Sequence, residues 1–528
     1  MLESTLAILN ANVYTLNPGK PSAKAIAVYD NRIVAVGTTE QVRRFIGRGT
    51  KVIDANKGTI IPGLNDCHVH MFSFGQFLQT LELRNTRSIK ELQTKLRRYA
   101  ERNPEKDWIQ GGRWDEEKLA EKRYPTRYEL DAAVSDRPVF LVRVCGHVAV
   151  ANSRALQAAG ITRKTAIQGG RAELDPQTGE LNGVLYENAL NLVSKTVPKP
   201  SSDELEHTCL LACKRAIKAG LTCVHWIIGS SREIDAIQKV QLAGKMPLRI
   251  HLGIPISLLE PLTLLGLQTG FGNDMVKIGF VKILADGSLG GHTAALEKPY
   301  SDKPETCGMM MYDEKQLFQL FTKSDRAGLQ IAVHAIGDRA IEAVLNSFEK
   351  TLKTDPSNAH RHRIEHCSVL NPEMIRRMKK LRLIASVQPH FVPSDFWLID
   401  RVGQTRARWV YPFKTLMRQG LTLAAGSDCP VEPISPILGV WGAVTRKRFT
   451  EENLTVQEAL RMYTVNAAYS SFDEKERGTI EVGKLADLTI LSADLLNVPL
   501  DDIKKIKVHM TIVDGKVVYA RRRSSRSH

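Results

Sequence analysis

The chain has 528 residues, of which 43% are hydrophobic and 25% are charged. A chain of this size and composition can bury a large core, so a mainly disordered protein is excluded. The formal net charge is +16, but no nucleic-acid recognition motif accompanies it, and we expect no nucleic-acid partner. The most apolar stretch, 252–267, is interrupted by Pro255, Glu260 and Pro261, so we expect no membrane span.

The start of the chain and its cysteines bear on the compartment. The first residues show no basic segment followed by an apolar one, so no secretory signal is expected. The eight cysteines are scattered and form no CxxC pair, which argues against a disulfide framework and against a zinc ribbon. We therefore expect a reducing, cytoplasmic environment.

Both ends of the chain are rich in strand patterns. A tight turn at Asp30-Asn31 separates two apolar runs within residues 5–62, and Asp514-Gly515 forms a second turn near the other end. Neither end has enough strands for a stable two-layer core by itself. We expect residues 1–62 and 476–520 to pack together as one discontinuous β-sandwich, followed by a basic, disordered tail at 521–528.

The sequence pattern is different in residues 63–475. Short apolar strands alternate there with helical segments, which is typical of parallel βα units. Eight strands are predicted: 60–67, 221–227, 248–254, 278–285, 329–335, 362–369, 382–388 and 421–427. The expected fold class is therefore α/β, with a closed (β/α)8 barrel. The segment 71–219 is too long for one crossover helix, so it should hold an inserted subdomain.

Polar residues collect where the predicted strands end. In (β/α)8 barrels the carboxyl ends of the strands carry the catalytic residues. Because alternate residues of a strand face the same side, two histidines of the first strand should point together. Five strands contribute six candidates: His68, His70, Lys282, His334, His366 and Asp428.

Imidazole and carboxylate groups in this mixture favour a divalent metal, with zinc as the first choice and one or two ions per chain. Two ions could share a hydroxide that is nucleophilic at neutral pH. Any one of these histidines alone is more often a packed core residue, and the combination is what favours a metal. Lys282 differs from the others, because a protonated ammonium group cannot be a ligand. It could serve only after deprotonation or modification.

The ordered segments PGLNDCHVH, VKILADGSLGGHTAAL, VHAIGDRA, RIEHC, SVQPHF and GSDCPVEP resemble the amidohydrolase superfamily. More narrowly, the chain resembles the amidohydrolase-3, YtcJ-like branch, which includes N-substituted formamide deformylases. The resemblance covers nearly the whole chain. It implies two metal ions held by His68 and His70 and by His334 and His366, a carboxylated Lys282 that bridges them, and Asp428 as a ligand that shuttles the proton.

Residues on the substrate side are less sharply predicted. His292 stands where many relatives have Arg, and Cys145 stands where they tend to have Asp. These two differences leave the choice of substrate undecided and do not affect the predicted metal site. His390, after the seventh strand, is a candidate donor to an oxyanion, although it could equally pack beside Pro389. Five further residues are similar to positions that approach the pocket in the family: Trp114, His147, Asn152, Glu187 and Asp286.

The hypothesis is a metal-dependent hydrolase that cleaves a non-peptide C–N bond of a small molecule, in an amide, a formamide or a cyclic amide. A deaminase or an ester or lactone hydrolase on the same barrel remains open, as does a non-catalytic protein that keeps the fold. The insert could cap the mouth of the barrel or form a subunit interface, and the resemblance suggests a homo-oligomer.

Overall fold

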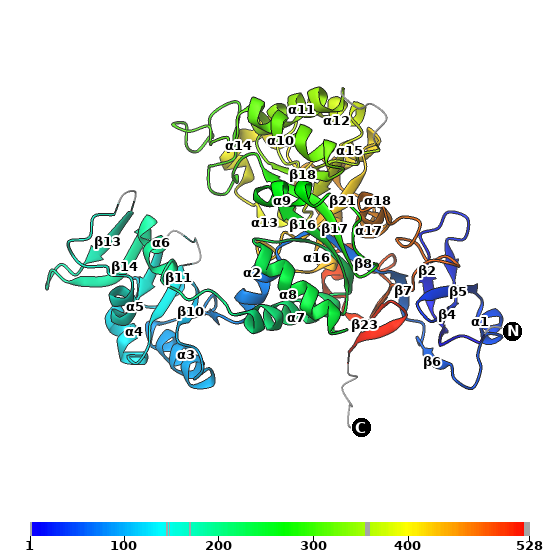
Figure 1. The fold of residues 1–528 in the computed structure, drawn as a ribbon, viewed down its shortest axis with the longest axis horizontal. Coiled ribbons are helices and arrows are strands. Elements are labelled where there is room, and N and C mark those ends of the chain that lie inside the picture. The colour runs from blue at the N-terminus through cyan, green and yellow to red at the C-terminus, as the bar shows by residue number, and fades with distance from the viewer. Residues whose placement is uncertain (1–2, 144–145, 147, 168–169, 354–358, 522–528) are drawn as a thin grey trace. The chain divides into compact units, whose positions relative to one another are not determined.

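The computed structural model describes residues 3–143, 146, 148–167, 170–353 and 359–521. The chain divides into two compact units, one of residues 1–74 and 205–528 and the other of residues 75–204. The second unit lies inside the segment that the sequence predicts as an insert. His147 and Cys145 lie outside the described residues. Figure 1 labels the elements, and each unit is described here by itself.

The core of the first unit is a sheet of eight strands that follow one another around a barrel, and every paired neighbour is parallel. Nearly all of its strand residues are buried, as expected when helices cover a parallel sheet. This confirms the predicted barrel. In order around the sheet the strands are β8 (Leu64–Val69), β15 (Leu221–Ile227), β16 (Arg249–Pro255), β17 (Val276–Leu284), β18 (Gln330–Ala335), β19 (Arg363–His366), β20 (Ile384–Val387) and β21 (Leu423–Ala425).

One predicted strand is in fact two. The apolar run 60–67 is divided at Gly63 between β7 (Thr59–Pro62) and β8. The first belongs to a sheet of the sandwich and the second to the barrel. A Cβ at Gly63 would lie 2.2 Å from the Thr222 hydroxyl oxygen, so this close crossing requires glycine. An uninterrupted apolar pattern could not show that the chain changes sheets there.

The first and last barrel strands meet through short contacts beyond the strand ends. The Asp428 N–H donates to the His68 carbonyl at 2.7 Å, and the His70 N–H donates to the Cys429 carbonyl at 2.9 Å. We call these two hydrogen bonds the seam. Gly426 permits the approach, because a Cβ there would lie 2.5 Å from the His68 nitrogen. Three predicted metal ligands, His68, His70 and Asp428, therefore lie where the barrel closes.

Amphipathic helices connect the barrel strands. The pair α10 and α11 pack together, with the Phe321 and Phe348 rings 4.3 Å apart between their centroids, and both rings are buried. Within the described residues, no helix combines the length and the apolar character that crossing a bilayer takes. The main outer helices are α7 (Ser202–Lys218), α8 (Ser231–Leu242), α10 (Glu314–Arg326), α11 (Asp338–Leu352), α12 (Pro372–Lys380), α15 (Phe413–Arg418), α16 (Pro436–Val444) and α17 (Val456–Met462).

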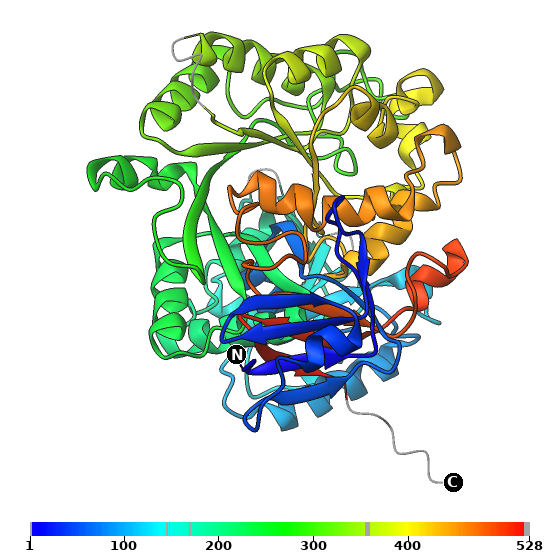
Figure 2. The same cartoon turned by 90° about the vertical axis from the view of Figure 1, so that its right-hand side faces the viewer.

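Strands from both ends of the chain form the β-sandwich, as predicted. One sheet is N-terminal and has the order β5 (Arg32–Gly37), β4 (Ala25–Tyr29), β1 (Leu6–Leu9) and β6 (Lys51–Asp54). The other has the order β24 (Lys516–Ala520), β23 (Val508–Val513), β22 (Leu488–Leu491), β7, β2 (Asn12–Tyr14) and β3 (Ser22–Ala23). Antiparallel pairing of β22 with β7 joins the two ends, and in Figure 2 the blue and red strands lie side by side.

The second unit has its own sheet and core. Its strands are ordered β13 (Gly170–Leu174), β14 (Leu181–Glu187), β12 (Val148–Ala151), β11 (Val139–Arg143), β10 (Ile109–Trp114) and β9 (Leu81–Glu82). Helices α3 (Ile89–Arg102), α4 (Arg127–Ala133), α5 (Ser153–Ala158) and α6 (Asn188–Ser194) accompany it. Apolar side chains from both layers form a buried cluster around Trp114 and Leu96.

Candidate metal centre

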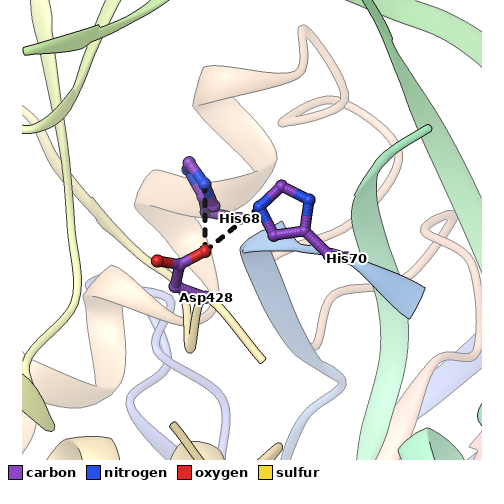
Figure 3. Close-up of side chains that lie close together, drawn as sticks. All are labelled: His68, His70 and Asp428. Atoms are coloured by element: carbon purple, nitrogen blue, oxygen red, sulfur yellow. Dashed lines mark ion pairs between the residues drawn. The ribbon is translucent and has the colours of Figure 1, made fainter. Parts of the chain in front are cut away.

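Three of the predicted ligands converge at the seam: His68 on β8, His70 just after β8, and Asp428 just after β21. The Asp428 carboxylate oxygen Oδ1 lies 3.4 Å from Nε2 of His68 and 3.2 Å from Nε2 of His70, and Figure 3 shows both rings turned toward it. One ligand atom from each residue lies within 4.8 Å of the other two. This grouping of two imidazoles and a carboxylate suits a divalent cation.

His334 on β18 and His366 on β19 continue the cluster. The His366 ring centroid lies 4.8 Å from that of His68 and 4.5 Å from that of His334. His366 Nδ1 is 2.7 Å from the Gln388 side-chain oxygen, and His334 Nε2 is 2.9 Å from the Gly287 carbonyl. The His366 contact fixes Nδ1 as the donor and leaves Nε2 available as a ligand atom.

Lys282 projects from β17 into the same end of the barrel. Its side chain is buried, and its Nζ has no hydrogen-bond partner among the described residues. Burial lowers the pKa of Lys282 to about 8, against the opposing effect of Glu365 and Asp428. Burial and the charge of Lys282 oppose protonation of His68, although the pKa of His68 is raised overall by Glu365 and Asp428. A buried ammonium group without a partner is unfavourable, so this amine is suited to reaction or to a bound group.

Sequence reasoning missed the residues that hold His68. Its Nδ1 lies 2.5 Å from a Glu365 carboxylate oxygen, and the other oxygen of Glu365 accepts from Arg363 at 2.6 Å. Both side chains are fully buried. Such a carboxylate orients a metal-binding imidazole and makes it more basic. The signal was present in the sequence, because two charged residues at alternate positions of an apolar strand face the same side.

The charges of this cluster support its use as a set of ligands. Burial raises the pKa of the Asp428 carboxyl, but His68, His70 and His366 outweigh it and hold that pKa well below its usual range. Burial also opposes ionisation of Glu365, yet Arg363 and His68 keep its pKa well below normal. Both carboxylates are therefore ionised. Burial, with the neighbouring His334 and His68, lowers the pKa of His366, so this ring is neutral and can donate its lone pair.

The backbone is unusual at two of these residues. His366 has a φ of 69° and Asp428 a φ of 55°, which is the left-handed region that residues other than glycine rarely adopt. Strain of about 1–3 kcal/mol at each is typical of functional sites. A sequence pattern does not contain this information, because neither position carries glycine.

The substrate-side residues of the first unit have other partners. The buried Asp286 carboxylate accepts from the N–H groups of Ala295, Ile336 and Gly337 at 2.8–3.0 Å, so it fixes two loops. His292 contacts Asp302 at 3.2 Å. His390 Nδ1 lies 2.5 Å from the Glu432 carboxylate, which orients the ring and leaves Nε2 as its second polar atom.

The candidates within the insert have contacts of a structural kind. Trp114 is fully buried and donates from its indole nitrogen to the Leu141 carbonyl at 3.1 Å. Asn152 is also buried, and its side-chain oxygen caps α5 by accepting from the Ala155 N–H at 3.0 Å. Glu187 is exposed at the end of β14, with a φ of 52°. The structure therefore gives Trp114 and Asn152 roles inside the unit that contains them.

Comparison with known proteins agrees with this geometry. A sequence model of the amidohydrolase family matches residues 51–519. The chain belongs to the amidohydrolase family. It is 35% identical to YtcJ of Bacillus subtilis (strain 168), over 96% of this chain and 98% of that protein, and 28% identical to the N-substituted formamide deformylase of Arthrobacter pascens, over 98% of each.

A solved structure extends the agreement to three dimensions. The chain resembles a metal-dependent hydrolase from Pyrococcus horikoshii OT3, with a TM-score of 0.81 and 30% identity over 94% of this chain and 99% of that one. Family and fold together identify a metal-dependent hydrolase that acts on C–N bonds other than peptide bonds. The reaction class expected from the sequence, metal-dependent hydrolysis of a C–N bond, is therefore confirmed.

Proposed function

We propose that this amidohydrolase uses two zinc ions at the barrel mouth to hydrolyse an amide or formamide bond of a small molecule. The observation that carries the proposal is the convergence of His68, His70 and Asp428 beside a buried Lys282 amine that has no hydrogen-bond partner in the described part of the chain. His334 and His366 complete the proposed ligand set. Reaction of the neutral Lys282 amine with carbon dioxide would release a proton and leave a carbamate, whose single negative charge is shared by two oxygens, in place of the unfavourable buried ammonium group.

The chain's own residues account for orientation and proton transfer. When bound, the metal supplies Lewis acidity for the carbonyl and lowers the pKa of water. Glu365 holds the His68 ring, and Asp428 is ionised and placed between two imidazoles, where it can accept a proton from the attacking water and return it to the leaving nitrogen. His390, oriented by Glu432, is the proposed donor to the carbonyl oxygen as negative charge develops there.

The experiment that tests this proposal is elemental mass spectrometry on purified, chelator-free protein. About two transition-metal ions per chain would support the bridged site, and intact mass measured under native conditions would detect a carboxyl group on Lys282. About one ion per chain would be consistent with a hydrolase but would reject Lys282 as a bridge between two ions. No bound metal, with no gain of hydrolysis on adding zinc, manganese or cobalt, would reject the proposal.

Product analysis separates the proposed reaction from its alternatives. A panel of N-alkyl and N-aryl formamides should yield formate and a free amine in equal amounts. Release of ammonia from an aminated ring would instead indicate a deaminase, and release of an alcohol from an ester or lactone would indicate an ester or lactone hydrolase on this barrel.

Part of the proposal is that the insert shapes substrate choice and that the chain acts as a homo-oligomer in the cytoplasm.

A further inference from the structure

Asp66 is a buried carboxylate close to the candidate metal centre, and the proposed reaction gives it no role. It lies on β8, two residues before His68, and it is 1% exposed. It is outside the group of His68, His70 and Asp428, whose ligand atoms lie within 4.8 Å of one another. Because a carboxylate is costly to bury unless donors surround it, its contacts indicate what it does.

Both oxygens of Asp66 accept hydrogen bonds at the place where the barrel closes. Oδ1 accepts from the Ser427 N–H at 2.9 Å and from the His68 N–H at 3.1 Å, and Oδ2 accepts from the Ser427 hydroxyl at 2.5 Å. Ser427 follows β21, so a side chain of the first barrel strand holds the chain at the end of the last strand. A Cβ at Gly426 would lie 2.9 Å from Asp66 Oδ1, so glycine leaves the room that this carboxylate needs.

These contacts fix the residues on both sides of Asp428. Ser427 precedes it and is held by Asp66 through its N–H and its hydroxyl group. Cys429 follows it, and the Cys429 N–H donates to the Ser427 hydroxyl oxygen at 3.1 Å. Asp428 itself has a left-handed backbone, with a φ of 55°. A strained conformation of this kind persists only where the surrounding contacts determine it, and Asp66 with Ser427 provides such contacts.

The ring of His68 has a separate support. Its Nδ1 lies 2.5 Å from a Glu365 carboxylate oxygen. Arg363 pairs with Glu365, and Nη1 of Arg363 lies 2.7 Å from Nδ1 of His225. These residues act on the imidazole, whereas Asp66 accepts from the main-chain N–H of His68. The contacts of Asp66 and of Glu365 therefore fix different parts of the same residue.

We propose that Asp66 is a positioning residue, which sets the separation of His68 from Asp428 by joining β8 to the segment after β21. Its oxygens hold the main chain of one ligand and the residue before the other. Nε2 of His68 and Oδ1 of Asp428, 3.4 Å apart, are thereby placed before an ion arrives, and binding to a pre-formed arrangement orders fewer groups. The effect on metal affinity rests on the proposed function, and the effect on the separation does not.

The first test is a crystal structure of the metal-free, full-length protein with Asp66→Ala. The separation of Asp428 Oδ1 from His68 Nε2 should increase beyond 3.4 Å. Asp131→Ala is the matched control, because Asp131 accepts from the N–H and the hydroxyl group of Ser153 at 3.1 and 2.6 Å. Asp131 belongs to the unit of residues 75–204, which contains none of the proposed metal ligands, so the control should leave the separation unchanged.

The second test uses cobalt(II) as the metal probe. The affinity for cobalt should fall about 10- to 100-fold in Asp66→Ala, as when a side chain that supports a metal ligand is lost. The visible absorption band of the bound ion should also change, because the arrangement of the ligands changes. Asp66→Asn keeps an oxygen for the two N–H groups and should restore most of the affinity. Asp131→Ala should match the unsubstituted protein in both affinity and spectrum.

An unchanged separation in Asp66→Ala would overturn the proposal, and so would an unchanged affinity for cobalt or an equal loss in Asp131→Ala. If Asp66→Ala does not fold, Ser427→Ala removes only the contacts of the hydroxyl group, and it should lengthen the same separation and weaken cobalt binding. No change in Ser427→Ala would then overturn the proposal. An unsubstituted protein that binds no cobalt would count against the proposed function, and the metal-free separation would still decide the role of Asp66.

Discussion

The two ends of the barrel both contain histidines, and they use them differently. At the amino-terminal end, His362 accepts from the Ile331 N–H at 3.1 Å through Nδ1 and contacts Asp325 at 3.1 Å through Nε2, so both ring nitrogens have protein partners. At the carboxyl end, the Nε2 atoms of His68 and His70 both face one oxygen of Asp428. The two ends therefore differ in arrangement rather than in residue type: His362 pairs with two separate partners, whereas at the carboxyl end the Nε2 atoms of two histidines converge on one carboxylate oxygen.

The largest effect should come from Asp428→Asn, which tests the carboxyl end directly. The amide keeps the shape but cannot accept the proton, so kcat should fall about 10²- to 10⁴-fold. Circular dichroism should show a retained fold. Turnover close to that of the unsubstituted protein would remove Asp428 from proton transfer.

Lys282→Ala should have the next largest effect. Without the amine no carbamate can form, so metal content should fall from about two ions per chain toward one, and activity should fall roughly 100-fold, as when a metal site loses its support. Short-chain carboxylic acids should restore part of the activity by occupying the vacated space. Full metal content in this variant would contradict a bridging role.

Glu365→Gln tests the support behind the His68 ring. The substitution removes the negative charge of Glu365 that faces His68, and it leaves the buried Arg363 without its ion pair. Metal affinity should therefore weaken about 10- to 100-fold. Glu432→Gln is the matched control, because Glu432 contacts His390, which is outside the proposed ligand set. Equal metal affinities in the two variants would contradict the assignment.

The pH dependence of activity should test the role of His68 at the carboxyl end of the barrel. Burial and Lys282 lower the pKa of His68, but Glu365 and Asp428 outweigh them and raise it above its usual value of 6.5. A raised pKa means that this ring becomes protonated while the pH is still above 6.5, and a protonated ring cannot bind metal. Activity should therefore fall on acidification, and added zinc should move the decline to lower pH. A decline independent of zinc concentration would indicate another group.

The smallest effect on the metal site should come from the amino-terminal end. His362→Phe removes the acceptor for the Ile331 N–H, which should cost about 1–3 kcal/mol in free energy of unfolding. Metal content should stay unchanged, as measured by elemental mass spectrometry. His366→Phe is the paired variant at the other end, and we expect it to lose metal.

Patterns in the sequence predicted what depends on local periodicity and missed what depends on distant contacts. All eight barrel strands were predicted, and β15 has the predicted bounds of 221–227, because buried parallel strands are continuous apolar runs. The division at Gly63 was missed, since the crossing with Thr222 is 159 residues away in the chain. Glu365 and Arg363 were missed because their roles depend on His68 and His225 of other strands.

The substrate side was the least predictable part. Trp114 matches a family position, yet only the structure shows that its indole is enclosed in the core of the insert. Asp286 is similar in this respect, because its three backbone partners belong to loops that no spacing rule connects. Loop conformation follows from such contacts, and a single sequence does not encode them as a visible pattern.

The seam between β8 and β21 has a consequence for how the molecule folds. These two strands are separated by more than 350 residues of chain, so their union is a contact of very high order and should form late, after the loop-closure entropy of the whole barrel has been overcome. His68, His70 and Asp428 come from the two sides of that union. An ion held by all three residues would bind the closed barrel and not the open one. By thermodynamic linkage, metal binding would therefore raise the free energy of unfolding and favour closure of the barrel.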